Sequence, residues 1–353
     1  MLRKYSRAML YIGFILLIAL PFLSLVNSTY WFFRAFDFAK IQLISLQFLF
    51  FVGWLIFCSP KKNLDYLLVL LLISSFIWHF ERILPYTSLV SKEAVPGEAS
   101  EEDRLTIVIA NVWQPNEKKA EFLEIIHEHS PDLILAMETD QQWEEALDTL
   151  ALLYPYSVKY PLDNLYGMHL YSKRMLIDTK LNFLVEDDIP SIQAKFVLPS
   201  GKVVNLFCLH PAPPSPTENE TSKERDAELM IVGKKISNME GAVVVCGDLN
   251  DVAWSYTTNL FKKVSGLLDP RVGRGLYPTF HTSFFFFRVP VDHLFHSNNM
   301  HLNEVKRLPY FGSDHFAMYY ELALDRKLQY EQADTLSNQE KEKVKEIIKK
   351  VED

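Results

Sequence analysis

The sequence is poor in cysteine, and its cysteines do not form a disulfide framework. Only three occur among 353 residues. Cys58 lies in a long apolar run, while Cys208 and Cys246 lie in β-like runs. A small disulfide-stabilised scaffold needs several paired cysteines in a short chain, so this class is excluded. We expect Cys208 and Cys246 to be free, buried thiols.

Zinc motifs and internal repeats are absent as well. The sequence contains no HExxH and no CxxC, and its ten histidines lack the spacing of zinc ligands. No segment recurs at an interval of about 20–50 residues, as it would in a repeat protein. These absences leave an ordinary globular body as the expected main part of the chain.

Charge is distributed unevenly along the chain. Residues 1–80 hold seven Lys and Arg against two acids, and the remainder holds 29 basic and 42 acidic residues. An overall hydrophobic content of 49% therefore combines an apolar, basic head with an acidic body. This composition excludes a disordered chain and a wholly soluble protein.

Three apolar runs fill the head, at Met9–Val26, Ile41–Cys58 and Leu64–Phe80. Each approaches the ~20 residues that a helix needs to cross a bilayer, so we predict three transmembrane helices. A cleaved signal peptide is disfavoured because no small-x-small site follows Leu25 and two further runs come after it. A soluble helical bundle is disfavoured because the three runs lack polar faces.

The charged residues around these runs predict the orientation. Basic residues precede the first run and separate the second from the third; they are Arg3, Lys4, Arg7, Lys61 and Lys62. The loop between the first two runs holds charges of both signs. The positive-inside rule then places the N-terminus in the cytoplasm. Three crossings of the inner or plasma membrane deliver everything after Arg82 to the extracytoplasmic side.

We divide the chain into four parts: a transmembrane region (1–82), a polar and acidic linker (83–103), a body (104–325) and a charged C-terminal helix (326–353). In the last part, Ser337 and Glu340 form a capping box and an apolar stripe begins at Val344. The stripe is expected to pack on the body or on a partner.

The body alternates short β-rich runs with amphipathic helices, which indicates a mixed α/β domain. The expected strands are 104–111, 132–138, 167–172, 191–199, 202–210, 242–248, 290–297 and 313–324. The expected helices are 116–129, 140–153 and 221–237.

Polar side chains interrupt the ends of these strands. They are Asn111, Glu138, His210, Asp248, Asn250, Asp292, Asp314 and His315. Because acids are depleted from buried strands, their recurrence at strand ends suggests that they converge on one cleft. Carboxylates and asparagine without a Cys/His quartet favour a hard, oxygen-seeking ion such as Mg²⁺ or Mn²⁺.

Seven motifs occur in a fixed order over about 220 residues: IANVW, DLILAMET, GMHLYSKR, NLFCLHP, VVCGDLND, VPVDHLF and GSDHFAM. Together they resemble the endonuclease/exonuclease/phosphatase superfamily, which includes deoxyribonuclease I-like nucleases. The resemblance implies an α/β sandwich, with two β-sheets packed face to face and flanked by helices. It also implies a hydrolase that acts on phosphate ester bonds.

The resemblance implies a role for each matched residue. Glu138 would be the main ligand of Mg²⁺ or Mn²⁺, and Asn111 and Asp314 would complete the metal environment. The other five residues would be catalytic, and each has its own task. Asp248 would orient and deprotonate the attacking water, while Asn250 would hold the water or the phosphate.

Two histidines complete the implied machinery. His210 would donate a hydrogen bond to a phosphate oxygen, and His315, paired with Asp292, would stabilise the transition state. Imidazolium groups and a divalent ion suit this chemistry, because in-line attack on phosphorus accumulates charge on the non-bridging oxygens.

Several other residues are interpreted more simply. Trp113 and Trp143 are interpreted as packing residues rather than base-stacking platforms, and Arg225 is expected to form an ion pair on a helix surface. His169 departs from the superfamily pattern, and its role stays open. The run Phe284–Phe287 is either a buried strand or an exposed loop beside the cleft that meets a bilayer.

The favoured function is a membrane-anchored, divalent-metal-dependent phosphoesterase that acts by in-line water attack on a lipid-linked phosphate. A Mg²⁺-dependent nuclease is the alternative, and a catalytically silent membrane adaptor is an alternative of another class. Residues 101–327 hold 32 acidic against 22 basic side chains, whereas nucleic-acid binders carry clustered Lys and Arg. The choice between monoester and diester, and the oligomeric state, stay open.

Overall fold

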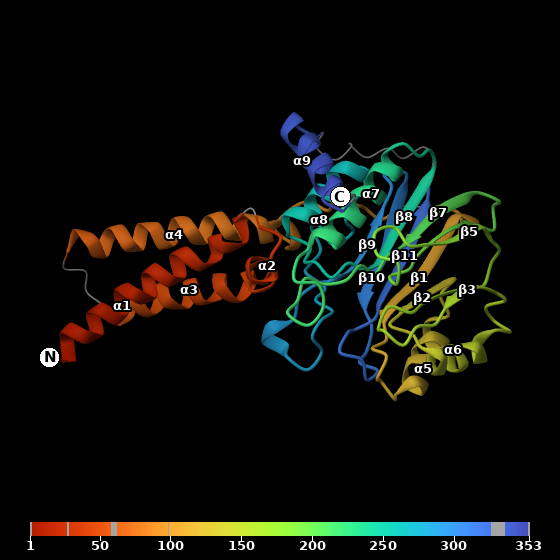
Figure 1. The fold of residues 1–353 in the computed structure, drawn as a ribbon, viewed down its shortest axis with the longest axis horizontal. Coiled ribbons are helices and arrows are strands. Elements are labelled where there is room, and N and C mark those ends of the chain that lie inside the picture. Colours follow the sequence, from red (N-terminus) through yellow and green to blue (C-terminus); the bar gives the residue numbers. More distant parts are fainter. Residues whose placement is uncertain (1, 27, 58–61, 98, 326–335, 352–353) are drawn as a thin grey trace.

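The computed structural model describes residues 2–26, 28–57, 62–97, 99–325 and 336–351. A bundle of apolar helices forms one end of the molecule and an α/β body forms the other (Figure 1). Cys58 and Lys61 lie outside the described residues.

Three long helices make up the apolar bundle: α1 (Leu2–Ala19), α3 (Lys40–Phe57) and α4 (Asn63–Ile83). Two segments, Ala8–Leu25 and Asn63–Tyr86, are long and apolar enough to cross a membrane. The short helix α2 (Trp31–Phe38) and α3 meet at 60° and would together make a third. The described part of the chain therefore has two or three candidate spans, which suggests association with a membrane.

The body is a sandwich of two mixed sheets, as predicted. The six-stranded sheet has the order β10-β11-β1-β2-β4-β3, and the five-stranded sheet has the order β5-β6-β7-β8-β9. The first comprises β1 (Arg104–Asn111), β2 (Leu133–Met137), β3 (Tyr156–Tyr160), β4 (Met168–Ser172), β10 (Met300–Arg307) and β11 (Met318–Leu324). The second comprises β5 (Leu176–Asn182), β6 (Ser191–Val197), β7 (Val203–Cys208), β8 (Ala242–Asp248) and β9 (Asp292–His296).

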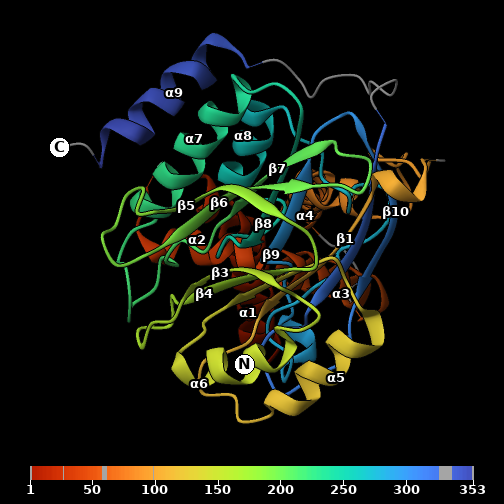
Figure 2. The same ribbon diagram turned by 90° about the vertical axis from the view of Figure 1, so that its right-hand side faces the viewer.

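Helices cover the outer face of each sheet (Figure 2). The helices α5 (Lys119–His129) and α6 (Gln141–Leu147) pack Phe122 and Trp143 on the six-stranded sheet. The helices α7 (Lys223–Ser237) and α8 (Tyr256–Ser265) cover the five-stranded sheet. The C-terminal helix α9 (Asn338–Lys349) buries Val344 and Ile347 in the same cluster, so its apolar stripe packs on the body.

Strand register brings the polar strand ends to one edge of the sandwich. In the parallel pair β1 and β2, Asn111 lies opposite Met137, and Glu138 follows directly. In the antiparallel pair β8 and β9, Asp248 lies opposite Asp292. The carboxyl ends of β1, β2 and β8 and the start of β9 therefore share one edge.

The two body cysteines are free and buried, as predicted, with Sγ atoms 4.0 Å apart. The segment 83–103, expected as a linker, lies along the body. Leu302 donates its backbone N–H to the Val95 carbonyl, and Lys262 pairs with Glu93 at 2.9 Å. The alanine between these acceptors, Ala94, is fully buried, so this polar segment is part of the body surface.

Candidate active site

A cleft of about 440 Å³ opens at the edge where the strand ends meet. Six of the eight predicted site residues line it: Glu138, His210, Asp248, Asn250, Asp314 and His315. The other two, Asn111 and Asp292, are buried directly behind them. The structure thus brings all eight residues together, although they lie up to about 200 positions apart in the sequence.

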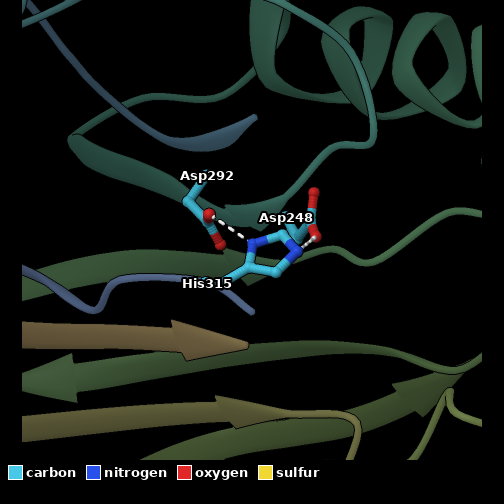
Figure 3. A group of neighbouring side chains, drawn as sticks. All are labelled: Asp248, Asp292 and His315. Atoms are coloured by element: carbon cyan, nitrogen blue, oxygen red, sulfur yellow. Dashed lines mark hydrogen bonds and ion pairs between the residues drawn. The ribbon is translucent and has the colours of Figure 1, made fainter. Parts of the chain in front are cut away.

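His315 lies between two buried carboxylates (Figure 3). Its Nδ1–H donates to Asp292 Oδ2 at 2.8 Å, and its Nε2 lies 3.6 Å from Asp248 Oδ2. Burial alone would lower the pKa of His315, but the two carboxylates outweigh burial and raise this pKa to about 10. The imidazole is therefore a cation at neutral pH and a strong hydrogen-bond donor.

Asp248 is the central carboxylate of the site. It receives hydrogen bonds from the Asn111 amide at 3.1 Å and from the Asn250 backbone N–H at 2.9 Å. Burial opposes ionisation, yet His315 and His210 hold the pKa of Asp248 below its ordinary value. Asp248 is consequently an ionised carboxylate, able to accept a proton or a hydrogen bond from water.

Glu138 follows β2 in a left-handed backbone conformation, with φ at 58°. Strained backbone of this kind concentrates at functional sites, and Trp113 (φ 57°) and Asn250 (φ 49°) show it in the same cleft. Asn111 donates to Glu138 Oε1 at 2.6 Å. Burial, together with the charges of Asp314 and Asp248, nevertheless raises the pKa of Glu138 to about 7.

Two groups in this cleft have the composition of a metal site, and they differ in chemistry. Asp248, Asp292 and His315 offer ligand atoms within 4.8 Å of one another. However, each ring nitrogen of His315 already faces a carboxylate of the same trio, at 2.8 Å and 3.6 Å, so these three side chains pair with one another. Glu138 and Asp314 offer oxygens that repel each other, and a hard divalent ion would relieve that repulsion.

His210 and Asn250 also line the cleft. Burial lowers the pKa of His210 to about 4, so the neutral ring carries a single N–H to donate. Its ring centroid lies 5.2 Å from that of Tyr166, whose hydroxyl bonds to Glu218. Asn250 donates its amide to the Pro211 carbonyl at 3.0 Å, which fixes the loop after His210.

Arg225 forms an ion pair, as expected, but it is buried, so its expected place on a helix surface was wrong. Its side chain is 1% exposed and donates to Asp226 Oδ1 at 2.8 Å. It also donates to the Asn250 carbonyl at 2.7 Å and lies 3.6 Å from Asp251. Arg225 therefore positions the turn that follows Asp248. The signal in the sequence was the continuous apolar run Leu229–Val232 on the same helix, which cannot face water on every side.

The structure decides the positions of three further residues, Trp113, Trp143 and His169. Trp143 is buried as expected, whereas Trp113 is 39% exposed and lines the cleft, so the packing role expected for Trp113 was wrong. His169 is fully buried, and its ring nitrogens lie 2.6 Å from Thr139 Oγ1 and 3.1 Å from Glu144 Oε2. These bonds tie β4 to the segment that follows Glu138.

The cleft has one wall that the sequence did not suggest. Trp31, Arg34, Ala35 and Phe38 of α2 line it together with the strand-end residues. The segment between the first two apolar runs thus reaches the same cleft as Asp248.

The family model for the endonuclease/exonuclease/phosphatase family matches residues 108–315. The chain belongs to this family. Members of the endonuclease/exonuclease/phosphatase family are divalent-metal-dependent hydrolases of phosphate ester bonds, so the chain is a phosphoesterase. The match runs from β1 to His315 and leaves the apolar helices outside it.

Solved structures of endonuclease/exonuclease/phosphatase proteins share the fold. D. rerio TDP2 complexed with a single-strand DNA product aligns with a TM-score of 0.54 and 16% identity, covering 62% of this chain and 98% of that one. A family protein from Bacteroides thetaiotaomicron aligns with a TM-score of 0.55 and 16% identity, covering 65% and 98%. The human Nocturnin catalytic domain with bound sulfate gives 0.51 and 15%, covering 64% and 96%. No curated protein matches the sequence.

Proposed function

We propose that this endonuclease/exonuclease/phosphatase protein is a membrane-anchored, Mg²⁺- or Mn²⁺-dependent phosphoesterase that hydrolyses a lipid-linked phosphate. The observation that carries the proposal is the position of the cleft. It lies where the apolar bundle joins the body, and α2 of the bundle contributes to its lining. A substrate held in a bilayer would therefore meet the site where the helices leave the bilayer.

The proposed anchor is the region 1–82, with three spans formed by α1, by α3 and by α4. The end of α3 and the start of α4 lie at the far end of the bundle, on the same side as the N-terminus, and the body lies at the opposite end (Figure 1). With Arg3, Lys4 and Arg7 in the cytoplasm, the body (104–325) faces the extracytoplasmic side.

The proposed metal site centres on Glu138, with Asp314 and Asn111 beside it. Asn111 directs its amide to Glu138 and accepts the Trp113 N–H at its own oxygen, so in this arrangement it orients Glu138. A bound Mg²⁺ or Mn²⁺ would supply Lewis-acid stabilisation of the charge on the phosphate oxygens.

The proposed proton and hydrogen-bond steps use the other residues. Asp248 orients the attacking water and accepts its proton, and Asn250 keeps Asp248 in place through its backbone N–H. His315, held as a cation by Asp292, donates to a non-bridging phosphate oxygen as negative charge accumulates there. His210 donates its N–H to a second phosphate oxygen.

A nuclease is the second candidate, because one structural neighbour was solved with a single-strand DNA product. The acidic body disfavours it, since phosphate-backbone binding draws on clustered Lys and Arg. A silent adaptor is disfavoured because all eight site residues are present and lie together.

The test uses the full chain in phosphatidylcholine vesicles, assayed on phosphatidic acid, on an oligonucleotide and on a soluble phosphate ester. We expect turnover to require Mg²⁺ or Mn²⁺ and to fall at least about 100-fold in Glu138→Ala, because metal-site residues typically carry effects of that size or more. Glu218→Ala, a cleft carboxylate outside the proposed machinery, is the control. Full activity in EDTA or in Glu138→Ala would contradict the metal site, and faster cleavage of the oligonucleotide would favour the nuclease.

A further inference from the structure

The short helix α2 is clamped onto the body at both of its ends. On its N-terminal side, Tyr30 forms an antiparallel bridge with Thr221, the Trp31 N–H donates to the Glu220 carbonyl at 2.9 Å, and the Ser222 N–H donates to the Thr29 carbonyl. On its C-terminal side, the Trp254 indole donates to the Asp37 carbonyl at 2.8 Å. These contacts hold α2 against the mouth of the cleft.

The cleft-facing residues of α2 differ in chemistry from the rest of the lining. Trp31 and Phe38 are large and aromatic, and Arg34 is a cation. Among the described residues that line the cleft, Arg34 is the sole Lys or Arg, whereas Glu138, Asp248 and Asp314 contribute negative charge. Besides the His315 cation, an anionic substrate that reached the carboxylates would therefore find a counter-charge on α2.

The hydrogen bonds of Arg34 leave part of its guanidinium without a partner. Nη2 donates to the carbonyls of Ser24 at 3.0 Å and Val26 at 2.7 Å, which fixes the side chain. Nη1 lies 3.8 Å from Asp37, but Lys40 pairs with the same carboxylate at 2.7 Å. Within the described residues Nε is buried and has no hydrogen-bond partner. Two cations thus share one carboxylate, and the guanidinium of Arg34 is only partly satisfied by hydrogen bonds.

We propose that α2 is the substrate-recognition element of this enzyme. Arg34 binds an anionic oxygen of the substrate, and Trp31 and Phe38 contact the adjoining apolar part. The cleft consequently selects an amphiphile that carries a phosphate. This proposal rests on the proposed lipid-linked substrate, and it adds the residues that recognise that substrate.

The experiment measures binding separately from turnover. The full chain in phosphatidylcholine vesicles is assayed with Mg²⁺ on p-nitrophenyl phosphate and on bis(p-nitrophenyl) phosphate, and a non-hydrolysable phosphonate analogue of phosphatidic acid is added as inhibitor. We expect Arg34→Gln to raise the inhibition constant at least tenfold and to raise the KM of the better soluble ester as well, because both molecules carry the anionic oxygen that Arg34 binds, while the melting temperature stays unchanged. Arg34→Lys should recover most of the inhibition, and Trp31→Ala should weaken it.

Arg82→Gln is the matched control, because Arg82 lies at the end of α4 and does not line the cleft. Unchanged inhibition in Arg34→Gln would overturn the proposal. An equal loss on soluble ester and phosphonate, with a lower melting temperature that Arg34→Lys does not restore, would also overturn it, since Arg34 would then be structural.

The outcome is distinguishable from failure of the proposed function. If the wild-type chain hydrolyses a soluble ester but the phosphonate does not inhibit it, recognition by α2 is wrong while the phosphoesterase stands. If the wild-type chain hydrolyses no ester, the proposed function is wrong. In that case the phosphonate still tests recognition by α2 through the melting temperature. A rise on adding the phosphonate that is lost in Arg34→Gln would support recognition by α2, and an equal rise in the wild type and in Arg34→Gln would overturn it.

Discussion

At the scale of single residues, the site depends on buried groups that hold one another's charge state. His315 is cationic because two carboxylates face it, and Asp248 is anionic chiefly because the His315 cation faces it. Buried ions of this kind persist only in each other's company, since a lone buried charge is strongly disfavoured. Changing one member should therefore alter the titration of the others.

The first prediction concerns pH. The pKa of His315 is raised from 6.5 to about 10, so its contribution to folding stability is complete below about pH 6.5 and is lost as the pH rises through 10. Asp292→Asn removes one of the two carboxylates that raise it. We expect the alkaline limb of the pH profile of kcat/KM to move to lower pH in this variant. Asp178→Asn, an exposed control, should keep the wild-type profile. An alkaline limb at the same pH in Asp292→Asn as in the wild type would contradict the pairing of His315 with Asp292 as a source of the raised pKa.

The second prediction concerns Arg225. Arg225→Met leaves Asp226 and Asp251 buried without their cation and frees the Asn250 carbonyl. Breaking a buried pair in this way costs about 3–5 kcal/mol of folding free energy. Thermal unfolding should show a clearly lower Tm, and kcat should fall because the turn after Asp248 loosens. The exposed Lys234→Ala on the same helix should cost less than about 0.5 kcal/mol. Equal melting temperatures for the two variants would refute this role of Arg225.

At the scale of elements, the sequence predicted interior strands well and edge strands poorly. The expected strand 104–111 is β1 as the structure has it, and 242–248 is β8. Three strands were missed: β3, β5 and β10. Each lies at the edge of its sheet, where exposed polar residues interrupt the apolar pattern. None of these three missed strands contains a predicted site residue, so the site residues could still be predicted from the sequence.

Site residues were predictable from the sequence where a polar residue ends an apolar strand. They were not predictable where contacts between distant segments bring a residue to the cleft. Asn111, Glu138 and Asp248 follow runs that read plainly as buried strands. The wall formed by α2 depends on a bridge between Tyr30 and Thr221, which no local pattern indicates. Because its apolar residues resemble those of the flanking spans, α2 was merged into a membrane loop.

The third prediction concerns the run Phe284–Phe287. It is an exposed loop, with exposed fractions of 57% to 80%, and Gln42 at the start of α3 donates to the Phe286 carbonyl at 2.7 Å. The run therefore lies beside the point where the apolar helix α3 begins. Burying one phenylalanine gains about 1.5–3 kcal/mol, so Phe285→Ser with Phe286→Ser should reduce turnover of vesicle-embedded phosphatidic acid about 100-fold.

The soluble ester reports whether this loss is specific to the membrane. We expect its turnover and the Tm to stay unchanged in the double serine variant. Leu152→Ser with Leu153→Ser, an exposed apolar pair on the α6 side, should leave both substrates unaffected. Equal losses on vesicle and soluble substrates would mean that the phenylalanines support the fold and do not meet a bilayer.

At the scale of the whole molecule, the apolar bundle and the body share one core. Ile44 and Ile83 of the bundle pack with Trp254 and Val291 of the body. The Tyr86 hydroxyl also donates to the Ala253 carbonyl at 2.6 Å. A body joined in this way cannot turn freely relative to the helices. The cleft therefore keeps a fixed position at the end of the bundle, where Phe284–Phe287 and α2 also lie.

The last prediction concerns the side of the membrane on which this cleft works. With the three spans proposed above, the body would lie opposite the basic N-terminal segment, so a phosphatase reporter fused after Arg82 should be active and a green fluorescent reporter at the same position should be dark. Fusions after Phe57 should show the reverse, because that end of α3 lies at the far end of the bundle. Bright fluorescence after Arg82 would place the body in the cytoplasm. The acidic surface would then be the remaining argument against nucleic acid, since the genome would be within reach of the cleft.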